Sequence, residues 1–241
     1  MLIDLLILVL AEAALEPIPR EIWDHPIIRS FSRRRGKHPR LIVLDRSHHH
    51  FAMKDLPNSE KRGRPDIVHF CLLEALGSPL NKEGLLRTYV HTIDDNAISI
   101  DPETRLPRNF NRFIGLIEDL FKHGHVPPKG KSLLSLETRS LPRLIEALKP
   151  TYTVIFERSG EPKTFEDVAL KLAMENRPAV LVGGFPHGEF SEETIRLADE
   201  VVCVDSEVLD AWVIVSRIIY EYERAIGLPK KRLEQLINRG S

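Results

Sequence analysis

Residues 181–190 read LVGGFPHGEF, a stretch in which an apolar run ends on two adjacent glycines. Gly183 and Gly184 close the run, and a third glycine, Gly188, follows shortly after them. Glycines at the end of a buried strand let the backbone approach a ligand closely. A phosphate site would carry a Gly-x-Gly-x-x-Gly turn or a Lys-Ser/Thr pair after the last glycine, and neither is present. The stretch therefore predicts a loop for another kind of ligand.

The remaining apolar runs alternate between strand-like and helix-like patterns, which predicts an α/β fold with a largely parallel sheet and helices on both faces. Asp94-Asp95-Asn96 predicts a local hairpin turn. The Val126-Pro127-Pro128 region marks the connection between a basic half, residues 1–125, and a ligand-binding half, residues 126–241, of a single domain. Strands are expected at 41–45, 87–93, 151–156, 178–182 and 200–204, and helices at 66–76, 110–122, 141–149, 165–175, 192–199 and 210–226.

The most apolar segment is Leu5–Leu10, which is only six residues long. A membrane span needs about 20 apolar residues, and a secretory signal needs a basic n-region. We therefore expect a buried strand or helix start, no membrane association and a cytoplasmic protein. Cys71 and Cys203 stand in apolar contexts without a Cys-x-x-Cys pair, which predicts buried, inert thiols.

Charge is distributed unevenly along the chain. From Arg29 to Arg64 there are 11 Lys and Arg residues against 3 Asp and Glu, whereas from Glu157 to Glu223 there are 6 against 15. A basic field in the first half attracts polyanions. The alternative for such a charge run, Arg33-Arg34-Arg35 included, is a solvated basic loop.

A second arginine group opens the helix expected at 110–122. Arg108 and Arg112 are four residues apart and share one helix face, and Arg105 lies just upstream. The helix macrodipole disfavours cations at this end unless anions accompany them. Phosphate groups would supply such anions, but surface salt bridges to Asp101, Glu103 or Glu118 explain the arginines equally well.

Lys61-Arg62-Gly63-Arg64-Pro65-Asp66 leads into the helix expected at 66–76. Asp66 is placed to cap that helix, or to hold the guanidinium of Arg64 for bidentate contact with a phosphate or a base edge. His48-His49-His50 predicts no metal site, because adjacent histidines point in different directions and no Cys or carboxylate partner completes the set.

Acidic residues follow the glycines. Glu189, Glu192 and Glu193 would repel a phosphate but not a cation such as the sulfonium of S-adenosylmethionine. The next strand releases a second, apolar loop, so that two strand ends could enclose an adenine through backbone groups.

Four separated motifs occur in order along the chain: GRPDIVHFCLLEALGSPLNK, TRLPRNFNRF, VGGFPHGE and VDSEVLDAWVIVSRIIYEYE. Together they resemble the ribosome-biogenesis pseudouridine N1-methyltransferases of the SPOUT, or α/β-knot, class. The resemblance covers nearly the whole chain. It implies a homodimer whose C-terminal third forms a trefoil knot, S-adenosylmethionine as cofactor, and methylation of N1 of a pseudouridine in small-subunit ribosomal RNA.

The same resemblance implies roles for individual residues. Arg64 is expected to bind the substrate RNA and Asp66 to steady it, and these two are the candidate catalytic residues. The remaining RNA contacts are expected at Arg105, Arg108 and Arg112. The cofactor is expected to contact, mostly through their backbone, Gly183, Gly188, Val204, Ser206, Glu207, Val208, Leu209, Asp210 and Ala211.

Two other functions compete with this interpretation. A non-catalytic assembly factor that binds pre-rRNA would carry the same basic half. A nucleotide-dependent oxidoreductase is disfavoured because no Gly-x-Gly-x-x-Gly follows a strand.

Overall fold

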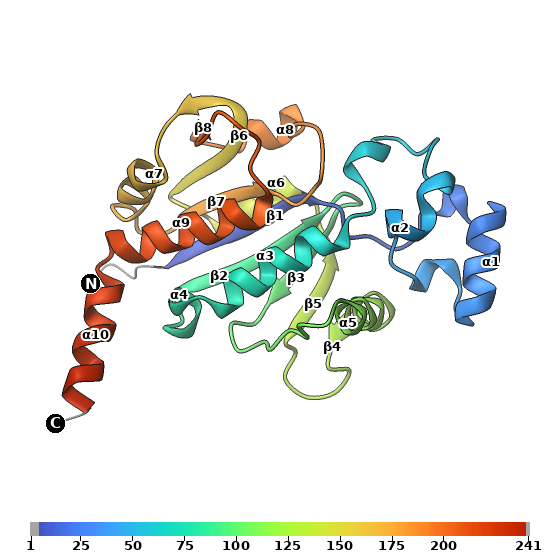
Figure 1. The fold of residues 1–241 in the computed structure, drawn as a ribbon, viewed down its shortest axis with the longest axis horizontal. Coiled ribbons are helices and arrows are strands. Elements are labelled where there is room, and N and C mark those ends of the chain that lie inside the picture. The colour runs from blue at the N-terminus through green and yellow to red at the C-terminus, as the bar shows by residue number, and fades with distance from the viewer. Residues whose placement is uncertain (1–4, 240–241) are drawn as a thin grey trace.

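One eight-stranded sheet organises the protein, and the computed structural model describes residues 5–239 of it (Figure 1). The strand order is β4-β5-β3-β2-β1-β7-β6-β8. The five strands β2, β1, β7, β6 and β8 run parallel to one another. Strands β3, β5 and β4 extend the sheet beyond β2, each antiparallel to its neighbour. The predicted α/β fold with a largely parallel sheet is confirmed. The strands are β1 (Leu6–Ala13), β2 (Leu86–Thr92), β3 (Asn96–Ile100), β4 (His125–Val126), β5 (Leu134–Thr138), β6 (Tyr152–Pro162), β7 (Pro178–Gly183) and β8 (Glu200–Cys203).

Helices cover both faces of the sheet, as predicted. The helices α3, α5, α7 and α9 pack on one face, and α6 and α8 on the other. Figure 1 shows α10 extending away from the body beyond the end of α9. The α-helices are α1 (Pro26–Arg35), α2 (Arg46–His49), α3 (Pro65–Gly77), α4 (Pro79–Lys82), α5 (Phe110–His123), α6 (Leu141–Leu148), α7 (Phe165–Leu172), α8 (Glu192–Ile195), α9 (Ala211–Ala225) and α10 (Leu228–Arg239).

The central strand is β1, which explains why Leu5–Leu10 is the most apolar segment of the sequence. Leu6, Leu8 and Leu10 pack under α3 and its neighbours, while Ile7 and Val9 pack against α6. A parallel strand with helices on both faces has no solvent side, so its side chains form a continuous apolar run instead of an alternating one.

Between β1 and α3, residues 14–64 form a separate lobe that we call the basic insert. It has its own small core, built around Ile28, Ile42, Leu44 and Met53. The strand predicted at 41–45 is wrong: this segment forms only an isolated bridge between Pro17 and Val43. Ile42 and Leu44 are buried in the core of the insert and Val43 in the main core, and burial alone does not distinguish a strand from buried irregular backbone.

Other differences concern the ends of elements. Helix α8 ends at Ile195 instead of Asp199, because the Asp199 carboxylate accepts a hydrogen bond from the Thr153 N–H at 2.7 Å and leads the chain into β8. Strand β6 continues beyond Phe156 to Pro162 along β8. The hairpin turn at residues 94–96 is confirmed, with Asp95 at φ +57°. Helices α1, α2, α4 and α10 and strands β4 and β5 were not predicted.

Strands from both halves of the chain share the sheet, since β1 lies between β2 and β7. The division at residues 125 and 126, and the knot that the resemblance implies, stay predictions. Within residues 5–239, no helix is long and apolar enough to cross a membrane.

Candidate active site

A cavity of about 510 Å³ opens at the carboxyl ends of β7 and β8, beside residues 156–158 in the middle of β6. Its walls come from two loops: the glycine loop (residues 183–190) and the second loop (residues 204–210), with the start of α9 below them. Ligands of open α/β sheets bind at this edge, where neighbouring strands release their loops. The structure thus brings the two predicted ligand loops together.

Eight of the nine predicted cofactor residues line this cavity. Ser206 lies within the second loop but does not line the wall. The eight that do are Gly183, Gly188, Val204, Glu207, Val208, Leu209, Asp210 and Ala211.

Gly184 fixes the glycine loop against β1. Its N–H donates to the Ala11 carbonyl at 3.0 Å, and its carbonyl accepts from the Ala14 N–H at 2.8 Å. A Cβ at this position would lie 2.6 Å from the Ala13 Cβ. Only a glycine permits this approach. Gly188 is required for another reason, a φ of +97°, which lies in the left-handed region.

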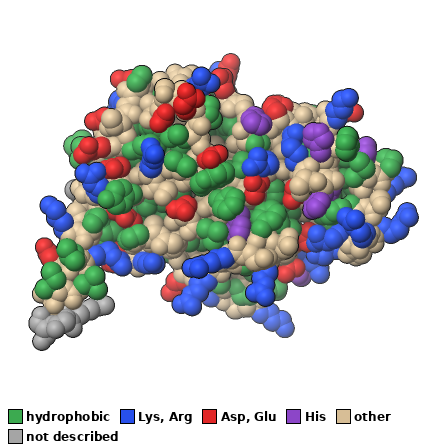
Figure 2. Space-filling view, viewed as in Figure 1, with side chains coloured by type: hydrophobic (Ala, Val, Ile, Leu, Met, Phe, Trp, Pro, Cys, Tyr) green, Lys and Arg blue, Asp and Glu red, His purple; other side chains and the backbone are tan. Residues whose placement is uncertain are grey.

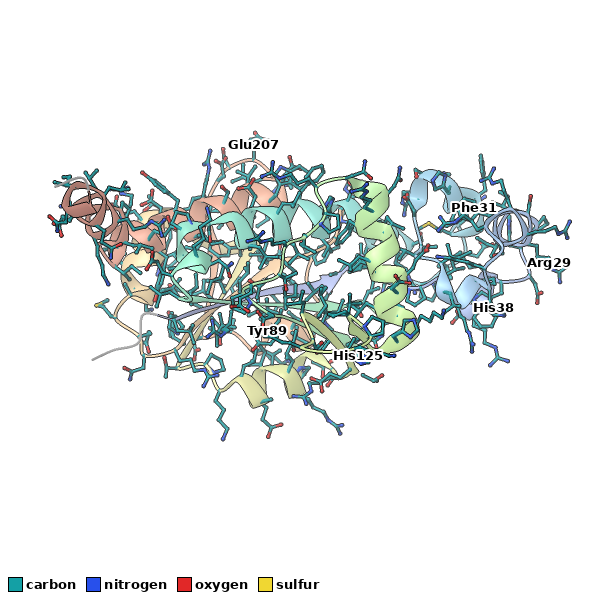
Figure 3. The ribbon with its side chains drawn as sticks, turned by 90° about the horizontal axis from the view of Figure 1, so that it is seen from below. Arg29, Phe31, His38, Tyr89, His125 and Glu207 are labelled. Carbon is teal, nitrogen blue, oxygen red and sulfur yellow. The ribbon has the colours of Figure 1, made fainter. Side chains whose placement is uncertain are left out.

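The second loop is shaped by its own hydrogen bonds. The Asp205 carboxylate accepts from the Glu207 N–H at 3.0 Å, and the Cys203 thiol donates to the Asp205 carbonyl at 3.3 Å. Glu207 itself points outward from the loop that precedes α9 (Figure 3). The expectation that Cys203 is buried is wrong: it is half-buried and lines the cavity, whereas Cys71 is fully buried, which raises the pKa of its thiol.

The lining of the cavity fits a cationic, adenosine-containing ligand such as S-adenosylmethionine. Apolar side chains such as Phe156, Leu209 and Ile214 offer surface to a base, and backbone groups of both loops lie between them. The lining residues include five acids and two arginines, a balance that favours a positive charge over a phosphate. The acids are Glu157, Glu189, Asp205, Glu207 and Asp210, and the arginines are Arg64 and Arg158.

Arg64 lines the same cavity from the side of the basic insert. Its Nε and Nη2 donate to the two carboxylate oxygens of Asp66, each at 2.8 Å. This hydrogen bond with Asp66 raises the pKa of Arg64. Asp66 is in the first turn of α3, and it lies outside the cavity wall. Its carboxylate orients the arginine; among the described residues, this side chain forms no capping hydrogen bond.

The arginine group of α5 is exposed. Within residues 5–239, the guanidinium groups of Arg105, Arg108 and Arg112 form no hydrogen bond or ion pair. The acids that could have neutralised them have other partners: Lys131 pairs with Asp101 at 3.0 Å and with Glu103 at 2.5 Å. The salt-bridge interpretation of the three arginines is therefore wrong for this structure.

Glu118, the third candidate partner, is buried on α5 and connects that helix to the basic insert. Its carboxylate accepts from Arg35 at 2.8 Å and from Lys37 at 2.5 Å. On the other side of α5, the Nε2 atom of His69 in α3 lies 2.7 Å from the carbonyl oxygen of Pro107. The His69 ring also stacks on Phe113. The insert, α5 and the start of α3 are thus held together, and Lys and Arg side chains gather over this end of the molecule (Figure 2).

The three histidines form no metal site. His49 is fully buried, its Nδ1 accepts from the Asp45 N–H at 3.0 Å, and burial lowers its pKa to about 4. His48 and His50 are exposed on the insert. In the part of the chain that the structure describes, no group of three or more His, Cys, Asp or Glu side chains is placed to hold a metal ion.

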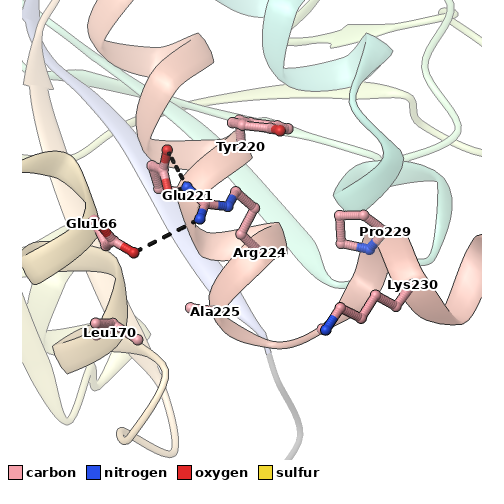
Figure 4. A pocket seen from close by; sticks show the side chains of 9 residues that line it. Glu166, Leu170, Tyr220, Glu221, Arg224, Ala225, Pro229 and Lys230 are labelled. Carbon is pink, nitrogen blue, oxygen red and sulfur yellow. Dashed lines mark hydrogen bonds and ion pairs between the residues drawn. The ribbon is translucent and has the colours of Figure 1, made fainter.

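A second cavity, of about 460 Å³, lies between α7, α9 and α10 (Figure 4). Arg224 crosses it, paired with Glu221 at 2.8 Å and with Glu166 at 3.8 Å. None of the predicted site residues lines it. Its carboxylates are already neutralised, and it is remote from the strand ends that release the ligand loops.

Some lining residues were missed from the sequence. Phe156, Glu157 and Arg158 directly follow the part of β6 that pairs in parallel with β7, so the common edge of parallel strands could have revealed them. Glu157 also accepts from the Phe190 N–H at 3.0 Å and so fixes the end of the glycine loop. Trp212 and Phe185 carried no signal that could have separated them from core aromatics.

The fold and site define an α/β protein with a candidate ligand cavity where parallel strands release two loops, beside a cationic surface. Residues 8–223 match the sequence profile of the EMG1/NEP1 methyltransferases. The chain belongs to this methyltransferase family, and the resemblance found in the sequence is confirmed.

Individual relatives agree over nearly their full length. The ribosomal RNA small subunit methyltransferase Nep1 of Thermococcus kodakarensis is 49% identical over 224 residues, covering 92% of this chain and 99% of the relative. The protein of the same name from Staphylothermus marinus is 46% identical, covering 92% and 96%. The crystal structure of Archaeoglobus fulgidus Nep1 bound to S-adenosylhomocysteine is similar with a TM-score of 0.80 and 40% identity, covering 91% of this chain and 98% of that one.

Proposed function

We propose that this protein methylates N1 of a pseudouridine in small-subunit ribosomal RNA, with S-adenosylmethionine bound between the glycine loop and the second loop. One observation supports this most directly: the oriented guanidinium of Arg64 lines the same cavity as both ligand loops. RNA and cofactor would meet at that residue. The names of the Nep1 relatives, and the S-adenosylhomocysteine bound to Archaeoglobus fulgidus Nep1 in its crystal structure, agree with this.

The bound cofactor supplies an electrophilic methyl group, and the protein has to align the attacking ring nitrogen with it. Alignment of two reactants can account for several kcal/mol of a barrier. Arg64 positions the RNA at the cavity mouth, and the glycine loop and the second loop hold the cofactor through backbone groups. No covalent residue is needed. Asp66 acts on the RNA through Arg64, since both of its oxygens face that guanidinium.

The RNA surface consists of Arg64 together with Arg105, Arg108 and Arg112. Among the described residues, the last three lack protein partners, so their guanidinium groups are available to phosphates. Arg64 is available in part, because it also pairs with Asp66. N1 of pseudouridine faces away from the Watson-Crick edge, so the target nucleotide has to lie in a loop or be turned out of a stack to reach the cavity.

The protein is further proposed to be a cytoplasmic homodimer. Hydrophobic side chains gather over α3 and α9 on one face of the molecule (Figure 2). Phe70 and Tyr220 are each about half exposed there, and Phe70 contacts Trp212 with ring centroids 5.2 Å apart. An exposed apolar face of this kind is typical of a subunit contact.

A methylation assay tests the function. A small-subunit rRNA hairpin with pseudouridine in its loop should be labelled, and the same hairpin with uridine should not. Equal labelling of both would refute the nucleotide specificity. Calorimetry with S-adenosylmethionine separates the enzyme from a non-catalytic assembly factor, because a scaffold with a degenerate cavity would bind no cofactor.

A further inference from the structure

Glu12 has an unusual backbone conformation at the carboxyl end of β1. Its φ is +49°, in the left-handed region that residues with a Cβ avoid. The register between β1 and β2 shifts between Leu10 and Ala13, across this residue. Non-glycine residues hold such conformations only where surrounding contacts fix them, and they cluster at functional sites.

The Glu12 carboxylate connects two segments that are distant in the sequence. One oxygen, Oε2, accepts from the Lys61 Nζ at 2.7 Å. The other, Oε1, accepts from the Ser191 N–H at 2.9 Å and from the Thr194 hydroxyl at 2.8 Å, just beyond the glycine loop. Burial raises the pKa of Glu12, but the hydrogen bonds from Lys61, Ser191 and Thr194 outweigh it, so the net effect lowers the pKa and favours the carboxylate.

Lys61 contacts the glycine loop directly as well. Its Nζ lies 4.5 Å from the centroid of the Phe185 ring, and a Cβ on Gly188 would lie 3.1 Å from the Lys61 Cε. Both side chains of the Glu12–Lys61 pair are only 12% exposed. Lys61 ends the 3-10 helix η4 (Ser59–Lys61), three residues before Arg64.

The next residue fixes the segment from the other side. Arg62 donates to both carboxylate oxygens of Glu16, at 2.7 and 2.5 Å, and that carboxylate is buried. Lys61 and Arg64 therefore stand three residues apart on one short segment that is anchored at Arg62, so the position of one constrains the position of the other. The contacts with Phe185 and Gly188 constrain the position of Lys61 in the same way.

From these contacts we infer that Glu12 and Lys61 are positioning residues that couple the two binding sites: ordering of the glycine loop by the cofactor orders the RNA-binding arginine, and RNA binding orders the loop. This inference rests on the proposed function. Linkage makes such coupling reciprocal, so each ligand should change the affinity of the other by the same factor. A merely structural ion pair would affect stability without linking the two affinities.

The test measures S-adenosylhomocysteine affinity by calorimetry with and without a saturating pseudouridine hairpin of small-subunit rRNA sequence. In the unmodified protein the RNA should tighten cofactor binding by at least about fivefold, the lower range of known couplings. Lys61→Met keeps the aliphatic chain beside Gly188 but loses the ammonium group, and it should abolish the coupling while each ligand alone still binds. Lys54→Met, at an exposed position of the same insert, is the matched control and should retain it.

Two results would overturn the inference: independent binding of the two ligands to the unmodified protein, or an undiminished coupling factor in Lys61→Met. Failure of the unmodified protein to bind S-adenosylhomocysteine would instead refute the proposed function. If the protein does not bind S-adenosylhomocysteine, hydrogen exchange of the ligand-free protein still tests the positioning role of Lys61. Lys61→Met should accelerate exchange of the amides of residues 185–191, and unchanged exchange would refute the positioning role by itself.

Discussion

Arg64 and Asp66 form a bidentate ion pair at the first turn of α3, with two hydrogen bonds of 2.8 Å each. The carboxylate fixes the plane of a guanidinium that is 37% exposed and lines the ligand cavity. Such a planar fork suits a phosphate or a base edge. The pair thus converts a flexible arginine into a directed donor at the point where we expect RNA to enter.

Asp66→Ala should weaken RNA binding about tenfold, which corresponds to about 1.4 kcal/mol. The reason is that Arg64 loses the group that orients it. Cofactor affinity should not change, because Asp66 does not line the cavity. Fluorescence titration of a labelled hairpin measures the RNA affinity, and calorimetry measures the cofactor affinity. A mutant with normal RNA affinity but a slow single-turnover rate that depends on pH would show that Asp66 is the proton acceptor instead.

Arg64→Lys provides a second, separate test of the same geometry. Lysine keeps the charge but lacks the planar fork, so it cannot form the paired hydrogen bonds with Asp66. We expect RNA affinity near that of Arg64→Ala. Full retention of affinity would show that charge alone matters at this position.

Arg108→Ala should remove one phosphate contact. The slope of log affinity against log salt concentration should decrease by about 0.7 to 0.9, with cofactor affinity unchanged. Arg143→Ala is the matched control, because Arg143 is an exposed arginine on α6, on the opposite face of the sheet. An unchanged slope in Arg108→Ala would place that residue outside the RNA surface.

Gly184→Ala should disrupt the cofactor site. Its Cβ would lie 2.6 Å from the Ala13 Cβ and 2.8 Å from the Ala13 Cα, so strand β1 or the glycine loop has to move. Overpacking of this kind costs about 1 to 3 kcal/mol of stability. Calorimetry should show weakened S-adenosylhomocysteine binding. The control is Gly115→Ala within α5, where no atom lies within 4 Å of the added Cβ, and this change should stabilise the helix by about 0.5 to 1 kcal/mol.

The sequence predicts the parallel core of the fold well because its strands are buried on both faces. Runs such as PAVLV at β7 are readable for this reason. The same signal misleads at residues 41–45, where Ile42 and Leu44 are buried in the core of the basic insert and the segment does not join the sheet. An apolar run reports burial, and the partner that buries it lies elsewhere in the chain.

The site divides in a similar way. The loops around Gly183 and Leu209 follow from local patterns. Whether Arg108 is free depends on which cations pair with the neighbouring acids. Lys131 pairs with Asp101, and Arg35 pairs with Glu118, which is 83 residues away from it in the sequence. The role of Glu12 depends on a positive φ, which no feature of the local sequence requires. Pairings over such distances are decided by the tertiary fold.

Buried His49 predicts a loss of stability in acid. Burial lowers its pKa from 6.5 to about 4 in the folded state, so between these values the unfolded chain binds more protons. The contribution of His49 to the free energy of unfolding is therefore complete above about pH 6.5. It decreases as the pH falls toward 4, by up to about 3 kcal/mol. Urea unfolding at pH 7.5 and pH 5 should show a smaller difference for His49→Gln than for the exposed-site control His50→Gln. Equal differences in the two variants would mean that the groups lost in acid lie elsewhere, with His69 and His91, whose pKa values burial also lowers, as the next to replace.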